Sequence, residues 1–143
     1  MSDFLLPVDD DELTQPFWEG CAQGELRMQR FTASGRYCWP PRPMDPASRT
    51  LEYEWVPVSG NGTVWSVTIP HPPLLPAYSE VAPYNVILVQ LDDDPNLRMV
   101  GNLVESADAP LNSIDPHSVE IGEPVRVVFA PIGDMHLPRW VRA

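Results

Sequence analysis

Side chains that could do acid–base or nucleophilic chemistry are few and far apart in this chain. The 143 residues include three histidines and two cysteines, and they contain no lysine. The lack of lysine excludes Schiff-base chemistry, a lysine general base and a Walker-type phosphate lysine. His117 and His136 have no spacing typical of a metal site. No serine, cysteine or carboxylate is placed in sequence to form a triad with His71. We therefore expect no catalytic residue in this chain.

Residues 31–48 have the layout of a small zinc ribbon without its ligands. Two tight turns flank an aromatic strand and a Pro-rich stretch. The four positions at which paired metal ligands would be expected hold Phe31, Ser34, Asp45 and Ser48. A structural zinc needs four nitrogen, sulfur or carboxylate donors in a tetrahedron, and only Asp45 is a credible donor. We therefore expect no metal, and we expect the ribbon to be held by an aromatic cluster of Phe31, Tyr37 and Trp39.

Charge is distributed unevenly along the chain, whose formal net charge is −11. Residues 1–25 carry seven acids and no arginine, and residues 50–143 carry twelve acids and four arginines. Residues 26–49 are the one basic island, with five arginines and a single acid. The overall acidity disfavours nucleic acid. The strands expected after residue 50 also lack the interleaved aromatic and basic residues that bind single strands, so we exclude that function.

The basic island is the candidate binding surface. Arginine forks suit phosphate oxygens, so this surface could meet the phosphates of coenzyme A, or it could meet an acidic patch of a partner enzyme. A solvated hairpin whose alternate residues happen to be arginine is the remaining alternative. A Pro-rich loop over 70–83 adds a histidine and exposed apolar groups that suit an interface or an acyl chain. The candidate contact residues are Arg30, Arg36, Trp39, Arg42, His71 and Tyr78.

The pattern of apolar residues predicts a mainly β fold with one N-terminal helix. The 18 prolines argue against long helices, and a helix is expected from about Thr14 to Gly24. A short hairpin follows in the ribbon. Gly60-Asn61-Gly62 is a strong hairpin-turn signal. The strands expected beyond the ribbon are 52–58, 63–69, 84–91, 97–104 and 124–130.

Five strands with a long connection before the last favour an OB-fold Greek-key barrel over a β-sandwich, which would want about seven. The tail after Pro131 is expected to pack Trp140 on the barrel. The expected division is an acidic flexible arm over 1–13, the helix and metal-free ribbon over 14–49, and the OB-fold domain with its tail over 50–143.

The location of the protein is expected to be the cytoplasm. No apolar run approaches the ~20 residues needed to span a bilayer. The acidic N-terminus lacks the basic region of a signal peptide. Cys21 and Cys38 are expected to be buried free thiols, with a disulfide between them as the alternative. Asp92-Asp93-Asp94 lacks the alternating ligand pattern of an EF-hand and is interpreted as a β-turn.

Four ordered motifs give the chain a resemblance to a known family over about residues 14–130. Together they resemble the DUF35 proteins, which implies a rubredoxin-like zinc ribbon followed by an OB-fold domain. The family ribbon presents four cysteines, and none stands in the corresponding places here. The motifs are 16–20, 35–43, 55–64 and 100–103.

The resemblance also implies a function. DUF35 proteins are small companions of thiolase-like enzymes that make or cleave carbon–carbon bonds in acyl-CoA substrates. We therefore expect a non-catalytic accessory subunit of a thiolase, acyltransferase or steroid side-chain aldolase. The coenzyme A thioester would be the substrate of the complex, and no cofactor would be bound directly. The alternative is a stand-alone acyl-CoA or lipid-binding OB-fold protein. A hydrolase acting through His71 is a third hypothesis, for which we expect no turnover.

Overall fold

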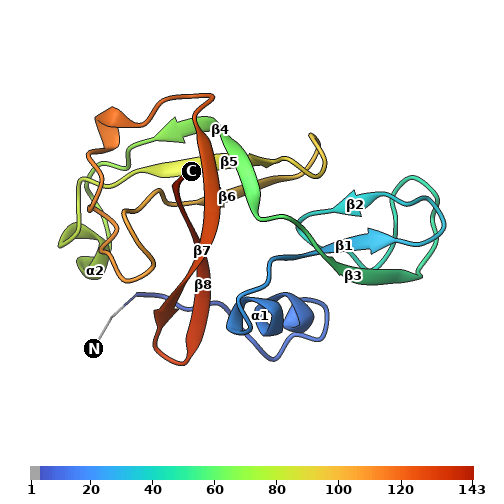
Figure 1. Ribbon diagram of the computed structural model, residues 1–143. Helices are drawn as coiled ribbons and strands as arrows, with labels where there is room; N and C mark the ends of the chain where they lie inside the picture. Colours follow the sequence, from blue (N-terminus) through green and yellow to red (C-terminus); the bar gives the residue numbers. More distant parts are fainter. Residues whose placement is uncertain (1–3) are drawn as a thin grey trace.

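The computed structural model describes residues 4–143, and it divides into a small ribbon and a curled β-barrel. Figure 1 shows the ribbon projecting to one side of the barrel, with the N-terminal helix beneath the junction. The elements of the helix and ribbon are α1 (Gln15–Ala22), β1 (Arg27–Phe31), β2 (Tyr37–Cys38) and β3 (Tyr53–Pro57). Those of the barrel are β4 (Asn61–Thr68), α2 (Pro76–Ser79), β5 (Val86–Leu91), β6 (Arg98–Gly101), the 3-10 turn η1 (Pro116–Ser118), β7 (Pro124–Ile132) and β8 (Met135–Arg142).

Two antiparallel sheets build these parts. The ribbon sheet has the order β2-β1-β3, and the barrel sheet has the order β6-β5-β4-β7-β8. In β5 the side chains alternate between buried and half-buried, which is the period of a strand that faces a core on one side. The mainly β fold predicted from the sequence is confirmed.

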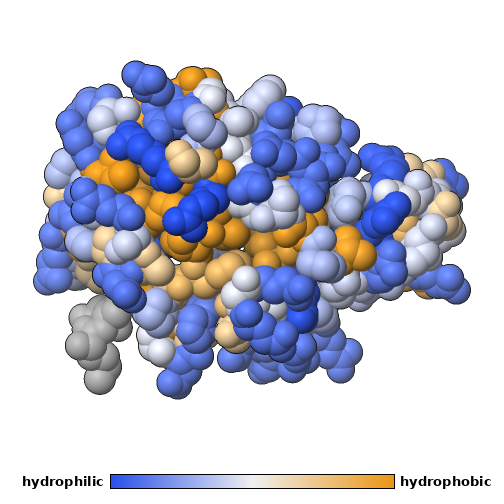
Figure 2. Space-filling model, in the orientation of Figure 1, coloured by the Kyte–Doolittle hydropathy of each residue, from blue (hydrophilic) through white to orange (hydrophobic). Residues whose placement is uncertain are grey.

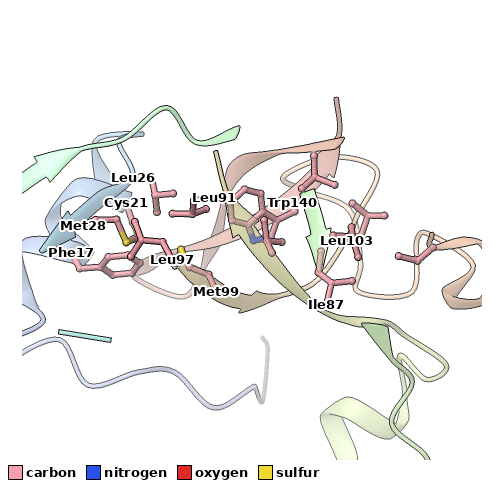
Figure 3. Close-up of a cluster of buried hydrophobic side chains, with 14 of the residues drawn as sticks. Phe17, Cys21, Leu26, Met28, Ile87, Leu91, Leu97, Met99, Leu103 and Trp140 are labelled. Carbon is pink, nitrogen blue, oxygen red and sulfur yellow. The ribbon is translucent and has the colours of Figure 1, made fainter. Parts of the chain in front are cut away.

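One hydrophobic core joins the two parts. Phe17 and Cys21 of α1 and Met28 of β1 lie in the same buried cluster as Leu97 and Met99 of the barrel. Figure 3 shows these side chains lying side by side, with the cluster continuing toward Trp140. The helix therefore packs on both the ribbon and the barrel. This shared core fixes the direction in which the ribbon projects, because sliding the ribbon would expose the buried side chains.

Two strand assignments from the sequence were wrong. The strand at 52–58 was expected in the barrel, but β3 pairs along its whole length with β1 of the ribbon. The Gly60–Gly62 segment is accordingly the crossing from ribbon to barrel and not a hairpin turn. The fifth barrel strand is instead β8, in the stretch expected to be a tail, and it pairs with β7 from Val125↔Arg142 to Ile132↔Met135.

The surface differs between the two parts. Figure 2 shows hydrophobic residues gathered across the visible face of the barrel, whereas the ribbon is mostly hydrophilic on that face. Among residues 4–143, no helix is long and apolar enough to cross a membrane.

Candidate functional site: a ribbon held by an aspartate

The first turn of the ribbon begins at Phe31, the last residue of β1. The amide of Phe31 donates to the carbonyl oxygen of Arg36 at 2.9 Å, and its own carbonyl accepts from the Gly35 amide at 2.8 Å. Gly35 has a φ of +70°, in the left-handed region that glycine adopts without steric cost. This is a tight knuckle closed by two backbone hydrogen bonds.

The second turn repeats this pattern from Asp45. Its amide donates to the carbonyl oxygen of Thr50 at 2.9 Å, and its carbonyl accepts from the Arg49 amide at 2.8 Å. Arg49 takes the left-handed position that Gly35 takes in the first turn, with a φ of 60°. The two knuckles therefore have the same hydrogen-bond geometry. The ribbon layout expected over residues 31–48 is present.

The carboxylate of Asp45 joins the two knuckles. Its Oδ2 atom accepts from the Ser34 hydroxyl at 2.6 Å and from the Ser48 hydroxyl at 2.7 Å. Its Oδ1 atom accepts from the amide of Ala47 at 2.9 Å. Asp45 is buried, with 1% of its surface exposed. Three of the four positions expected to hold metal ligands thus meet around one carboxylate.

The hydrogen bonds keep this carboxylate ionised. The Ser34 hydroxyl, the Ala47 amide and the Ser48 hydroxyl, in that order, lower the pKa of Asp45 to about 2. Burial acts in the opposite direction, and the positive charge of Arg36 assists the lowering. A buried charge is tolerated when hydrogen bonds replace its lost hydration, and here three donors do so.

The residues in the knuckles do not fit a zinc ion. Both oxygens of Asp45 already accept hydrogen bonds within the ribbon, and the fourth position, Phe31, is a hydrocarbon side chain that is 1% exposed. Over the described range 4–143, no three His, Cys, Asp or Glu side chains form a group that could hold a metal ion. A tetrahedral zinc needs four donors, and this site offers one.

The aromatic residues do not form the single cluster that the sequence suggested. Phe31 packs edge-on against Tyr53 of β3, with ring centroids 6.0 Å apart. Trp39 instead lies 4.4 Å from the Phe17 ring of α1. Tyr37 lies beneath the guanidinium of Arg30 at 5.7 Å. The aromatics therefore anchor the ribbon to its surroundings at separate points, and the knuckles are linked by the Asp45 hydrogen bonds.

The arginines of the basic island fall into two groups. Arg27 is occupied, with its Nε atom 2.6 Å from Glu25, and Arg30 donates to the Gly35 carbonyl at 3.2 Å. By contrast, the guanidinium groups of Arg36, Arg42 and Arg49 make no hydrogen bond or ion pair with any residue in the described part of the chain. All three are exposed.

Arg42 is held in place by its backbone. The buried Gln29 side chain donates to the Arg42 carbonyl at 2.7 Å and accepts from the Arg42 amide at 2.9 Å. Its guanidinium is therefore an exposed cation on a fixed backbone. That arrangement suits a recognition surface, because the backbone is already ordered and loses little conformational entropy on binding.

The other two candidate contacts lie on the barrel. His71 is exposed in the Pro-rich loop, and no described residue hydrogen-bonds to its ring. Tyr78 is half-buried on α2, where it packs between Phe4 at 4.8 Å and Tyr84 at 6.3 Å. No described contact brings either residue to the ribbon arginines. The six predicted contacts therefore do not form one site.

Two features of this region were missed in the sequence. Asp45 was considered only as the one credible metal donor, although an aspartate carboxylate often accepts a hydrogen bond from the backbone amide two residues on, as it does here from Ala47. Cys38 was expected to be buried, but it is half-exposed, and its Sγ atom contacts the Pro40 carbonyl at 3.3 Å. Cys21 is buried as expected.

Comparison with known proteins identifies relatives that match most of the chain. A family model described as the C-terminal OB-fold domain of ChsH2 matches residues 55–130. The alpha subunit of 3-oxo-4,17-pregnadiene-20-carboxyl-CoA hydratase from Mycobacterium tuberculosis is 32% identical over 141 residues, which cover 93% of this chain and 41% of that protein. A probable enoyl-CoA hydratase alpha subunit from Thermomonospora curvata is 36% identical over 110 residues, covering 76% and 31%. This chain thus spans less than half the length of these curated relatives.

Solved structures agree with the fold. A chain of the Ltp2-ChsH2(DUF35) aldolase superimposes with a TM-score of 0.79 at 28% identity, covering 95% of this chain and 98% of that chain. A DUF35 protein of unknown function from Sulfolobus solfataricus superimposes with a TM-score of 0.61 at 14% identity, covering 92% and 86%. The second likeness supports the fold alone. The expected OB-fold is confirmed.

Proposed function

We propose that this chain is a non-catalytic subunit of a thiolase-like enzyme of the aldolase type. The chain belongs to the DUF35 family, and its residues 55–130 match the family model of the C-terminal OB-fold domain of ChsH2. The enzyme would act on acyl-CoA substrates, and the CoA thioester would bind to the complex and not to this chain alone. We place this complex in the cytoplasm. The nucleophile, base and oxyanion hole would come from the partner.

One observation carries the proposal. The likeness to the chain of the Ltp2-ChsH2(DUF35) aldolase extends over 95% of this chain and 98% of that one. The likeness therefore covers the ribbon as well as the barrel. Because both parts of the fold are shared, the proposal rests on analogy with that assembly at the level of the whole fold.

The curated relatives support the acyl-CoA class but not a hydratase reaction in this chain. Both are named as hydratase alpha subunits, and this chain covers 41% and 31% of their lengths. More than half of each relative has no counterpart here, so we do not assign hydratase activity to this chain. Steroid side-chain degradation is the setting that the relative from M. tuberculosis favours, and we propose it for the complex.

The ribbon is the proposed contact surface for the partner. Three of its arginines, Arg36, Arg42 and Arg49, are exposed and pair with no residue of the described range 4–143, on an otherwise acidic protein. An acidic patch on the partner would complement them, and such complementarity governs association rate and orientation more than affinity alone. Trp39 supports the ribbon from beneath by packing on Phe17.

Co-expression with thiolase-like proteins from the same genome tests the proposal. We expect one of them to co-purify and to cleave or condense an acyl-CoA only when this chain is present. Separate elution, with partner activity that ignores this chain, would refute the subunit function. Micromolar binding of CoA esters to the isolated chain would favour a carrier instead.

A further inference from the structure

A pocket at one end of the barrel has a buried cation in its wall. Two adjoining hollows, of about 210 and 100 Å³, share four lining residues. The larger hollow is otherwise bounded by Val81, Pro110, Pro131 and Gly133, so its wall is mostly hydrocarbon. Arg139 of β8 is the one charged residue that lines either hollow within the described chain. The shared lining residues are Phe4, Leu111, Ile132 and Arg139.

Arg139 has no acidic partner among residues 4–143. Its residue surface is 9% exposed, and its one hydrogen bond to a described residue runs from Nη1 to the Ala109 carbonyl at a long 3.3 Å. No ion pair joins it to a carboxylate within residues 4–143. Burial lowers the pKa of this guanidinium. A guanidinium has five N–H donors and stays charged in proteins. The donors of Arg139 that make no bond to a described residue are not enclosed by the protein, so they remain open to a ligand in the hollow.

The pocket has a polar end at Arg139 and Tyr78, and the rest of its wall is mostly apolar. The smaller hollow adds Tyr78 beside Arg139, and the two are close enough to influence each other electrostatically. A carboxylate accepts two parallel hydrogen bonds from a guanidinium, which is among the strongest pairings available to arginine. The larger hollow continues from this end with a hydrocarbon wall. A ligand that satisfies both parts is an anion with a short apolar tail.

The N-terminal segment limits the size of the ligand. Phe4 lines both hollows and packs on Tyr78 at 4.8 Å. Leu6 lies against Gly133, with its Cδ1 atom 3.1 Å from where a Cβ would stand on that glycine. A segment of this chain therefore forms part of the border of the pocket. The two hollows, of about 100 and 210 Å³, have room for only a few water molecules at ~30 Å³ each, so they are suited to a small molecule.

We propose that the Arg139 pocket binds a small monocarboxylate with a short hydrocarbon body. The carboxylate would take the free donors of Arg139 and the Tyr78 hydroxyl, and the hydrocarbon would lie between Val81 and Leu111. Binding would give the buried cation a counter-charge that residues 4–143 do not supply. This site is independent of the subunit function, because it requires no partner protein.

The test uses octanoate as the probe and octan-1-ol as its neutral match, with the full chain and calorimetry or amide chemical shifts as the readout. We expect octanoate to bind at least tenfold more tightly than octanol, with shifts at Ala109 and Gly133. Arg139→Met should weaken octanoate at least tenfold and leave octanol unchanged. Arg126→Met, an exposed arginine on β7, should leave both within twofold.

Three outcomes would overturn the proposal. Equal affinities for octanoate and octanol would show that the pocket binds only the hydrocarbon and does not recognise the carboxylate. Full octanoate binding by Arg139→Met would show that the carboxylate binds at another place. Absence of octanoate binding up to millimolar concentration would remove the site altogether. Should Arg139→Met not fold, Val81→Trp fills the hollow from the opposite wall, and we expect it to abolish octanoate binding; unchanged binding would contradict the assignment.

Discussion

The Ser34 hydroxyl lies 2.6 Å from Oδ2 of Asp45, and this hydrogen bond ties together two knuckles that are 11 residues apart in the sequence. Ser48 completes the link from the second knuckle at 2.7 Å. In a zinc ribbon, one metal ion makes all the connections between two such turns. Here a single carboxylate accepts hydrogen bonds at that junction. The frame of the ribbon can therefore be held without metal chemistry.

Acid should loosen the ribbon. The pKa of Asp45 is lowered from its ordinary 3.8 to about 2, so its contribution to folding is complete above about pH 4 and is lost as the pH falls toward 2. Asp45→Asn should be less stable than the native chain at pH 7, and this gap should narrow as the pH falls through that window. Urea unfolding at several pH values measures it.

Asp108→Asn, an exposed aspartate on the barrel, is the matched control and should show no such gap. A stability difference between Asp45→Asn and the native chain that stays constant from pH 7 to pH 2 would contradict the role assigned to the carboxylate.

Zinc content distinguishes the two kinds of ribbon. The purified native chain should contain no zinc, because its knuckles offer one donor where four are needed. The quadruple variant Phe31→Cys, Ser34→Cys, Asp45→Cys and Ser48→Cys should bind about one zinc per chain, since the backbone of both knuckles is already formed. Elemental analysis after dialysis checks both. About one zinc in the native protein would show that our assignment of the site is wrong.

The two cysteines should differ in reactivity. Burial raises the pKa of Cys21 to about 12, so its thiol is protonated and enclosed at neutral pH. Burial also raises the pKa of Cys38, but that thiol is half-exposed, with Arg42 acting to lower its pKa. Ellman's reagent should label one thiol in the folded protein and two in denaturant.

The variant Cys38→Ser should remove the thiol that reacts in the folded state and leave the one seen in denaturant. Fast labelling of both thiols in the native protein would mean that the core shared by α1 and the barrel opens readily.

Charge reversal on the ribbon should weaken the proposed complex. Replacing Arg36 and Arg42 with glutamate places two negative charges opposite the proposed acidic patch of the partner, which would repel them. We expect at least a tenfold loss of affinity for the partner, with an unchanged circular dichroism spectrum of this chain. The same change at Arg126 should have less than a threefold effect. Arg98 is unsuitable as a control, because it stacks over Trp65 at 3.9 Å. Equal losses for both variants would place the interface outside the ribbon.

The barrel was predictable from the sequence because most of its strands carry strong periodic signals. The apolar run that ends at Leu91 became β5, an interior strand of the barrel sheet between β6 and β4. The errors have physical causes. A tail was expected over 135–142, where Pro138 has no backbone N–H to donate. In the structure this segment is β8, an edge strand of the barrel sheet, and there the missing N–H costs no ladder bond. Glycines at 60–62 suggested a turn, yet a Cβ on Gly62 would stand 2.5 Å from the Gln90 carbonyl oxygen. That glycine is required for close strand approach.

The candidate site was less predictable than the fold. The positions of the knuckles followed from turn residues, and the structure reproduces them. The role of Asp45 did not follow, since its partners lie on two turns whose distance is set by the sheet. Arg139 gave no signal at all, because whether a lone arginine is buried without an acid depends on how segments far apart in the sequence pack around it.

Native mass spectrometry of the co-expressed pair tests the central claim most directly. The sample is this chain with a thiolase-like protein from the same genome, purified through an affinity tag on the partner alone. We predict one assembly that contains both chains at a fixed ratio and that dissociates when Arg36 and Arg42 are reversed to glutamate. Detection of the two proteins only as separate species, at concentrations up to tens of micromolar, would contradict the claim that this chain is a subunit.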